Sequence, residues 1–132
     1  MNFNEYQEFT RSLAVYNTDV VLEAVDRSDD TSPARIDVWM PYLYPAMAIG
    51  EEAGEVLGKI AKFVRKSQAG VTEDMVSQLR LDVAKELGDV LYQVSETARQ
   101  FQWTLDDIVT MNQDKLTDRK DRGVLVGEGD NR

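Results

Sequence analysis

Apolar residues recur at every third or fourth position along most of the chain, and this spacing is typical of amphipathic helices. The pattern holds over four stretches, residues 4–26, 45–67, 73–101 and 105–120. A convincing alternation of apolar and polar residues, the mark of a half-buried strand, is not found. The sequence therefore predicts an all-α fold, a four-to-five-helix bundle whose apolar stripes face one another.

Capping residues and a proline predict where these helices begin. Asn4 is expected to cap the first helix, Thr72 the third, and the segment 103–107 the fourth. Pro45 suits the first turn of the second helix, because a proline there has no helical hydrogen bond to lose.

Two segments lack the helical pattern. The polar, proline-containing stretch from about 27 to 43 is expected to be a loop, and the glycine-rich end from about 121 to 132 an irregular tail. The aromatic residues near the end of the loop have two interpretations: they either pin it to the core or hold a nucleobase. They are Trp39, Tyr42 and Tyr44.

The length of 132 residues predicts a single domain over residues 1–132. The chain has no cysteine and no histidine, which excludes disulfides, thiolate nucleophiles, histidine bases and the usual zinc ligands. A net charge of −9 disfavours a nucleic acid polymer or an anionic membrane as the partner. Because no apolar run is long enough to span a bilayer and no signal pattern opens the chain, we expect a soluble cytoplasmic protein.

Two pairs of carboxylates stand out on neighbouring predicted helices. Glu52 and Glu55 form one pair and Glu86 and Asp89 the other, each three residues apart and therefore on one helix face. If the helices pack side by side, four like charges converge and need a counter-ion. Hard cations such as Mg²⁺ or Mn²⁺ prefer oxygen ligands of this kind. The alternative is an acidic face that is simply solvated.

The segment 44–55, which ends Glu51-Glu52-Ala53-Gly54-Glu55, resembles the EExxE signature of MazG-like all-α nucleoside triphosphate pyrophosphohydrolases. Glu86-Leu87-Gly88-Asp89 is similar to the ExxD that follows it in those proteins. The likeness continues through segments 112–116 and 119–123. The resemblance implies a single MazG-like domain and a bundle of that type, completed by assembly into a homodimer or homotetramer, with a self-sufficient monomer as the alternative.

The same resemblance implies Mg²⁺-dependent hydrolysis of a nucleoside triphosphate to the monophosphate and pyrophosphate, with Mn²⁺ as a substitute metal. Glu52, Glu55, Glu86 and Asp89 would be the metal ligands, and either Glu52 or Glu55 would also accept the proton of the attacking water. We expect a deoxynucleotide substrate in nucleotide-pool control, with a preference for guanine; dUTP, dCTP and phosphoribosyl-ATP are the alternatives. A non-catalytic helical binding module is the competing function.

Basic and amide side chains complete the expected site. Lys59 and Lys62 lie one and two turns after Glu55, where they either reach the phosphates or complement the helix dipole. Asn112, Lys115 and Arg119 share a face of the last helix. They resemble the substrate-contacting segment of the family, with a solvated face as the alternative.

Overall fold

The computed structural model describes residues 1–14 and 36–124, and the side chains of the second range from residue 42 on. Its helices are α1 (Phe3–Leu13), α3 (Ile36–Ser67), α4 (Glu73–Gln100) and α5 (Leu105–Asp121). All regular structure in the described ranges is helical, which confirms the all-α prediction.

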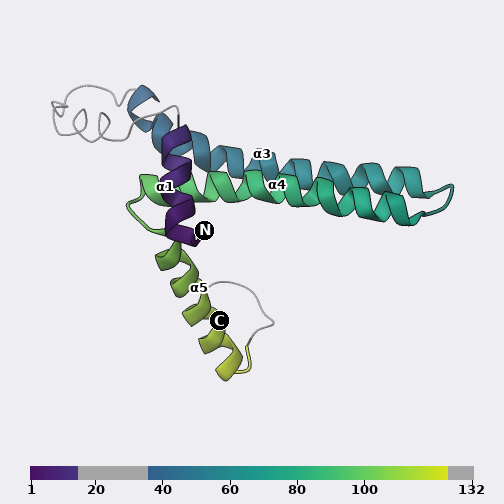
Figure 1. Ribbon diagram of the computed structural model, residues 1–132. Coiled ribbons are helices and arrows are strands. Elements are labelled where there is room, and N and C mark those ends of the chain that lie inside the picture. Colours follow the sequence, from purple (N-terminus) through teal and green to yellow (C-terminus); the bar gives the residue numbers. More distant parts are fainter. Residues whose placement is uncertain (15–35, 125–132) are drawn as a thin grey trace.

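Helices α3 and α4 form a long antiparallel hairpin, α1 crosses the end of this hairpin, and α5 leads away from it (Figure 1). The turn of the hairpin uses Gly70, whose φ of +122° is unfavourable for residues with a side chain. Thr72 then caps α4 by accepting a hydrogen bond from the Met75 backbone N–H at 3.3 Å. The predicted third helix and its cap are thus confirmed.

Polar residues of α1 fix this helix to the rest of the chain. The buried Gln7 amide donates to the Trp103 carbonyl at 3.0 Å, and its Oε1 accepts from the Leu105 N–H at 3.2 Å. The hydroxyls of the buried residues Thr10 and Ser95 are 2.8 Å apart. Since each of these groups loses water on folding, their mutual hydrogen bonds hold α1 against the junction of α4 and α5.

The start of the first helix differs from the prediction. Asn2, not Asn4, caps α1: its side chain accepts from the Glu5 N–H while the Glu5 carboxylate accepts from the Asn2 N–H. This reciprocal pair satisfies two free donors at once, and Asn4 instead donates to Asp106 at 2.7 Å. The helix ends at Leu13, followed by an extended Ala14, so the predicted span of 4–26 is too long; residues 15–26 lie outside the described range.

The second helix begins at Ile36 rather than at Pro45, so the loop predicted for residues 27–43 is wrong from 36 on; residues 27–35 are not described. A proline inside a helix costs about 3 kcal/mol. Pro45 is fully buried, and the Tyr42 ring packs edge-on against Phe101 with centroids 5.5 Å apart. This packing offsets the cost.

The contact with Phe101 favours the core-pinning interpretation of Tyr42. Tyr44 is 50% exposed, so it is not held in the core in the same way. The side chain of Trp39, the third aromatic residue of this segment, lies outside the described range.

The structure confirms the helix predicted for residues 105–120. Thr104 caps α5: its hydroxyl accepts from the Asp107 N–H while the Asp107 carboxylate accepts from the Thr104 N–H, a second reciprocal pair. The helix ends at Asp121, and Arg122–Val124 form a turn; the remainder of the expected irregular tail, 125–132, is not described.

Much apolar surface of the hairpin remains exposed within the single chain. On α3, Leu57 is 67% exposed and Val64 55%; on α4, Leu87 is 53% exposed and Leu91 37%. Apolar stripes of this size are normally covered in a folded protein.

None of the helices in the described ranges combines the length and the apolar character that a membrane-spanning helix needs.

Candidate metal centre

The α3–α4 hairpin brings three of the four predicted carboxylates together. Glu52 of α3 and Glu86 and Asp89 of α4 each place one carboxylate oxygen within 4.8 Å of the others. Glu86 is buried, Glu52 is half-buried and Asp89 is exposed. The cluster is therefore rooted between the two helices and reaches solvent on one side.

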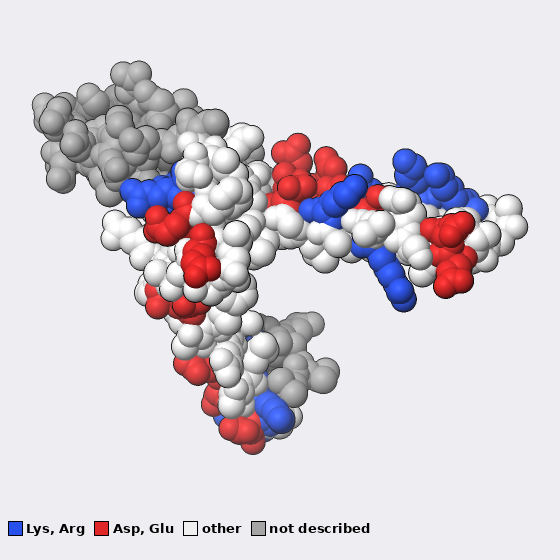
Figure 2. All heavy atoms as spheres, in the orientation of Figure 1, with Lys and Arg blue, Asp and Glu red and all other residues white. Residues whose placement is uncertain are grey.

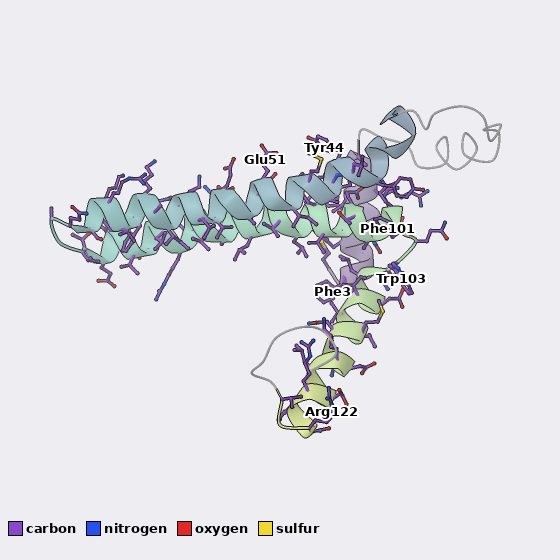
Figure 3. The ribbon with its side chains drawn as sticks, turned by 180° about the vertical axis from the view of Figure 1, so that it is seen from behind. Phe3, Tyr44, Glu51, Phe101, Trp103 and Arg122 are labelled. Carbon is purple, nitrogen blue, oxygen red and sulfur yellow. The ribbon has the colours of Figure 1, made fainter. Side chains whose placement is uncertain are left out.

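The fourth predicted carboxylate, Glu55, is exposed and is not part of this cluster in the described structure. Glu55 follows Glu52 by about one helical turn, at the edge of the same site, and its charge, like that of Glu51, raises the pKa of Glu52. Glu51, the neighbouring acid of the motif, is exposed and points away from α4 (Figure 3).

The surroundings of Glu52 raise the pKa of its carboxyl group. Desolvation raises the pKa of Glu52, and the nearby negative charge of Asp89 raises it further. A hydrogen bond from the Gln93 side chain opposes this change by stabilising the ionised form. The cluster thus carries repulsion that a cation would relieve.

A lysine of the protein itself supplies part of this positive charge. Lys59 Nζ lies 2.9 Å from Glu86 Oε1, and only 11% of the Glu86 side chain is exposed. The hydrogen bond to Glu86, followed by the charge of Glu86, raises the pKa of Lys59. Lys59, which the sequence placed near substrate phosphates, is thus bonded to a carboxylate of the cluster.

Two further residues belong to the surroundings of the site and were missed in the sequence. Gln93 is 7% exposed and hydrogen bonds to Glu52, while its own Oε1 has no hydrogen-bond partner among the described residues. Tyr6 comes from α1: burial raises the pKa of its hydroxyl, and the charge of Asp89 adds to that effect. Gln93 follows Asp89 by about one helical turn and therefore shares its helix face, a signal that the sequence already contained.

Lys62, the second predicted lysine, is exposed and lines a surface cavity of about 310 Å³ beside the cluster. Lys59 lines the same cavity and thereby connects it to Glu86.

The predicted residues of the last helix lie apart from the carboxylates in the single chain. Helix α5 points away from the hairpin (Figure 1). Asn112 and Lys115 are exposed, whereas Arg119 is only 5% exposed, so the three do not present one uniform surface.

The three gathered carboxylates fit a hard divalent cation. They offer only oxygen ligands, one of them is buried, and their mutual repulsion favours a bound positive charge. A helical hairpin that collects acidic side chains between its helices is an arrangement suited to carboxylate-based metal binding.

Comparison with known proteins gives the family. Residues 44–124 match the MazG nucleotide pyrophosphohydrolase domain. The chain is also 39% identical over 89 residues to the Gene 37 protein of Mycobacterium phage L5, a match that covers 67% of this chain and 75% of that protein. No solved structure matches the chain. The chain therefore belongs to the MazG nucleotide pyrophosphohydrolase family, in agreement with the resemblance found in its sequence.

Proposed function

We propose that the protein is an enzyme that hydrolyses nucleoside triphosphates to the monophosphate and pyrophosphate with the help of Mg²⁺. The observation that carries this proposal is the cluster of Glu52, Glu86 and Asp89, within 4.8 Å of one another, in a chain of the MazG family. The whole of residues 1–132 would form this one domain, acting in the cytoplasm.

The carboxylates would share two tasks. Glu52, Glu86 and Asp89, joined by Glu55 at the edge of the site, would hold the metal. When bound, Mg²⁺ would polarise the α-phosphate and lower the pKa of a water molecule. Either Glu52 or Glu55 would accept the proton of that water. A Glu55→Gln variant that keeps its metal affinity but loses turnover would assign the proton to Glu55.

Basic and amide residues would hold the substrate. Lys59 and Lys62 would contact phosphates, and Asn112, Lys115 and Arg119 would contribute further contacts to phosphate and sugar. Because α5 leads away from the hairpin, we expect its residues to serve the site of a neighbouring subunit (Figure 1).

The assembly would be a homodimer or a homotetramer that pairs the apolar sides of the hairpins. Leu57, Ile60 and Leu87 are 67%, 41% and 53% exposed in the single chain. Burying a fully exposed side chain of this size contributes about 1.5–3 kcal/mol, and covering the exposed part of each contributes a corresponding share of that.

The substrate would be a deoxynucleoside triphosphate, with guanine as the preferred base, in control of the nucleotide pool. This finer preference rests on the resemblance to short members of the family.

The test is to incubate the protein with each common ribo- and deoxyribonucleoside triphosphate and Mg²⁺, and to identify the products by ³¹P NMR. The proposal expects monophosphate and pyrophosphate, no product after addition of EDTA, and the fastest turnover for dGTP. Diphosphate and orthophosphate would contradict the proposed attack at the α-phosphorus.

The competing function is a non-catalytic helical binding module. One observation favours it: the Lys59–Glu86 ion pair already neutralises part of the acidic cluster without a metal. In the same assay this alternative expects no turnover of any nucleotide with either Mg²⁺ or Mn²⁺.

A further inference from the structure

A cavity of about 310 Å³ lies on the hairpin between the carboxylate cluster and the turn. Lys59, Lys62 and Lys66 line it, and Phe63, Met75 and Leu79 supply its apolar part. Asp82 is its single acidic residue, so three positive charges stand against one negative charge and the lining carries a net charge of +2. Such a lining suits a compact anion with several charged oxygens.

Charge is distributed unevenly along the hairpin on the two sides of the cluster. Towards the turn stand the lysines of the cavity. Towards α1 stand Gln93, Tyr6 and the fully buried Glu96, whose carboxylate is ion-paired with Arg99 at 2.6 Å. In Figure 2, acidic atoms lie near the middle of the hairpin and basic atoms beyond them towards the turn; a second acidic group lies beside the turn, and further basic atoms lie at the α1 end.

This asymmetry orients a bound polyphosphate. A triphosphate whose α-phosphorus lies at the carboxylates can extend its other phosphates in either direction along the hairpin. Among the described residues, the direction towards the turn offers three lysines, whereas the other leads to Gln93 and to Glu96, which already binds the cation there, Arg99, at 2.6 Å. We infer that the lysine cavity binds the departing pyrophosphate and that the nucleoside lies on the α1 side of the cluster, an inference that rests on the proposed function.

The geometry of α3 supports this reach. Lys62 and Lys66 follow Glu55 by roughly 10 and 16 Å along the helix axis. Helical side chains lean towards the N-terminus of their helix, so both lysines lean back towards the glutamates. Lys62 and Lys66 are exposed, which leaves their ammonium groups free to move onto a ligand.

Lys59 links the two sites. It lines the cavity while its Nζ bonds to Glu86 at 2.9 Å. A divalent cation on Glu86 would take over the negative charge that holds Lys59, and the ammonium group would then be available to the pyrophosphate in the same cavity. Lys59 is thus a counter-ion of the carboxylates before the metal binds and a phosphate ligand afterwards.

Titration calorimetry with pyrophosphate in the presence of Mg²⁺ tests the cavity directly. Lys62→Met and Lys66→Met should each weaken pyrophosphate binding by about 10-fold, the size of one charge-assisted hydrogen bond. Binding of a deoxynucleoside monophosphate, titrated separately, should change little. Arg65→Met is the matched control, because Arg65 precedes Lys66 in the last turn of α3 but does not line the cavity.

The Lys59→Met variant gives a second, independent readout. It should bind Mn²⁺ about two- to fivefold more tightly than the wild type in the absence of substrate, since a competing cation is gone. It should bind pyrophosphate more weakly. A structural role for Lys59 alone does not produce these opposite changes.

Unchanged pyrophosphate affinity in both Lys62→Met and Lys66→Met, or an equal loss in Arg65→Met, would overturn the inference. So would a wild-type protein that does not bind pyrophosphate. These outcomes are distinct from failure of the proposed function. Lysine-dependent pyrophosphate binding without any hydrolysis would support the pyrophosphate site and contradict the proposed enzymatic activity. Hydrolysis without lysine-dependent pyrophosphate binding would support the enzymatic activity and contradict the assignment of the cavity as the pyrophosphate site.

Discussion

The hairpin and α5 carry the two halves of the expected site. A single chain brings the residues of the hairpin half together, but it does not bring those of α5 to them. On the hairpin, Glu52, Glu86 and Asp89 meet within 4.8 Å, although α3 and α4 are separated by a turn. On α5, Asn112 and Lys115 are exposed on a helix that leads away from the hairpin (Figure 1).

The difference teaches which part of the site depends on assembly. The carboxylates are set by the packing of two helices that follow each other in sequence, so one chain suffices. The residues of α5 have no such fixed relation to the carboxylates. We therefore expect metal binding to be a property of the single chain and the substrate contacts of α5 to require its neighbour.

The largest effect is expected from removing the buried member of the carboxylate cluster. Glu86→Gln keeps the shape of the side chain but removes the charge that would hold the metal. Turnover should fall by more than about 100-fold. Losing a residue that only supports a metal ligand costs up to about 100-fold, and losing a ligand itself should cost more. Steady-state hydrolysis with Mg²⁺ measures this.

Glu51→Gln is the matched control for that experiment, because Glu51 is exposed and points away from α4 (Figure 3). Its turnover should stay near that of the wild type. Equal losses in both variants would mean that overall acidity, rather than the cluster, drives the activity.

Mixing two inactive variants tests whether α5 serves a neighbouring subunit. Glu86→Gln disables the hairpin half of the site, and Lys115→Ala disables the α5 half. After unfolding and refolding together, half of the dimers are mixed and each mixed dimer holds one intact site, so about a quarter of the activity should return. No recovery, with mixed dimers demonstrated by mass spectrometry, would place both halves of the site in one chain.

The apolar side of the hairpin is expected to control assembly. Leu57→Lys introduces a charge at a position that is 67% exposed in the single chain and that we place in the interface. The molar mass from light scattering should fall towards that of the monomer. Val71→Lys is the control: Val71 is 58% exposed but lies in the turn between α3 and α4. Unchanged mass in both variants would reject this interface.

The smallest effect is expected at the cap of α5. Thr104→Ala removes the side chain that accepts from the Asp107 N–H and should lower stability by about 1 kcal/mol, a few degrees in Tm. Thr110→Ala, in the exposed interior of α5, should leave the Tm unchanged or raise it. Equal Tm values for the two variants would show that the cap contributes nothing.

The same cap predicts a dependence on pH. Hydrogen bonds from the Thr104 side chain and backbone lower the pKa of Asp107 below its ordinary value of 3.8. A lowered carboxyl pKa adds stability above the ordinary value, and this stability disappears as the pH falls through the lowered pKa. Thr104→Ala should therefore lose less stability than the wild type on acidification across that range, as thermal melts at a series of pH values would show.

The features that the sequence predicted well are those with a short-range cause. Thr72 and Thr104 cap helices because the residues within one turn of them complete the hydrogen bonds. Glu86 and Asp89 share a face because helical spacing requires it. The order of the two acidic segments on consecutive helices then made their convergence a reasonable prediction.

The errors came from competition between local signals and from packing. Asn4 lost the cap to Asn2 because Glu5 completes the reciprocal pair with Asn2, whereas Gln7, three residues after Asn4, bonds to Trp103 and Leu105 instead. Pro45 suits the first turn of a helix, yet α3 begins at Ile36 and Pro45 lies buried in its interior. The Lys59–Glu86 ion pair joins two helices, so the sequence of either helix alone did not reveal it.

The most direct test of the carboxylate cluster as a metal centre is an equilibrium titration with Mn²⁺, followed by electron paramagnetic resonance, on the wild type, Glu86→Gln and Glu51→Gln. The cluster predicts that the wild type and Glu51→Gln bind Mn²⁺ with equal affinity and that Glu86→Gln loses most of it. Unaltered Mn²⁺ binding by Glu86→Gln would contradict the metal centre, and the hydrolysis proposed on it would lose its structural basis.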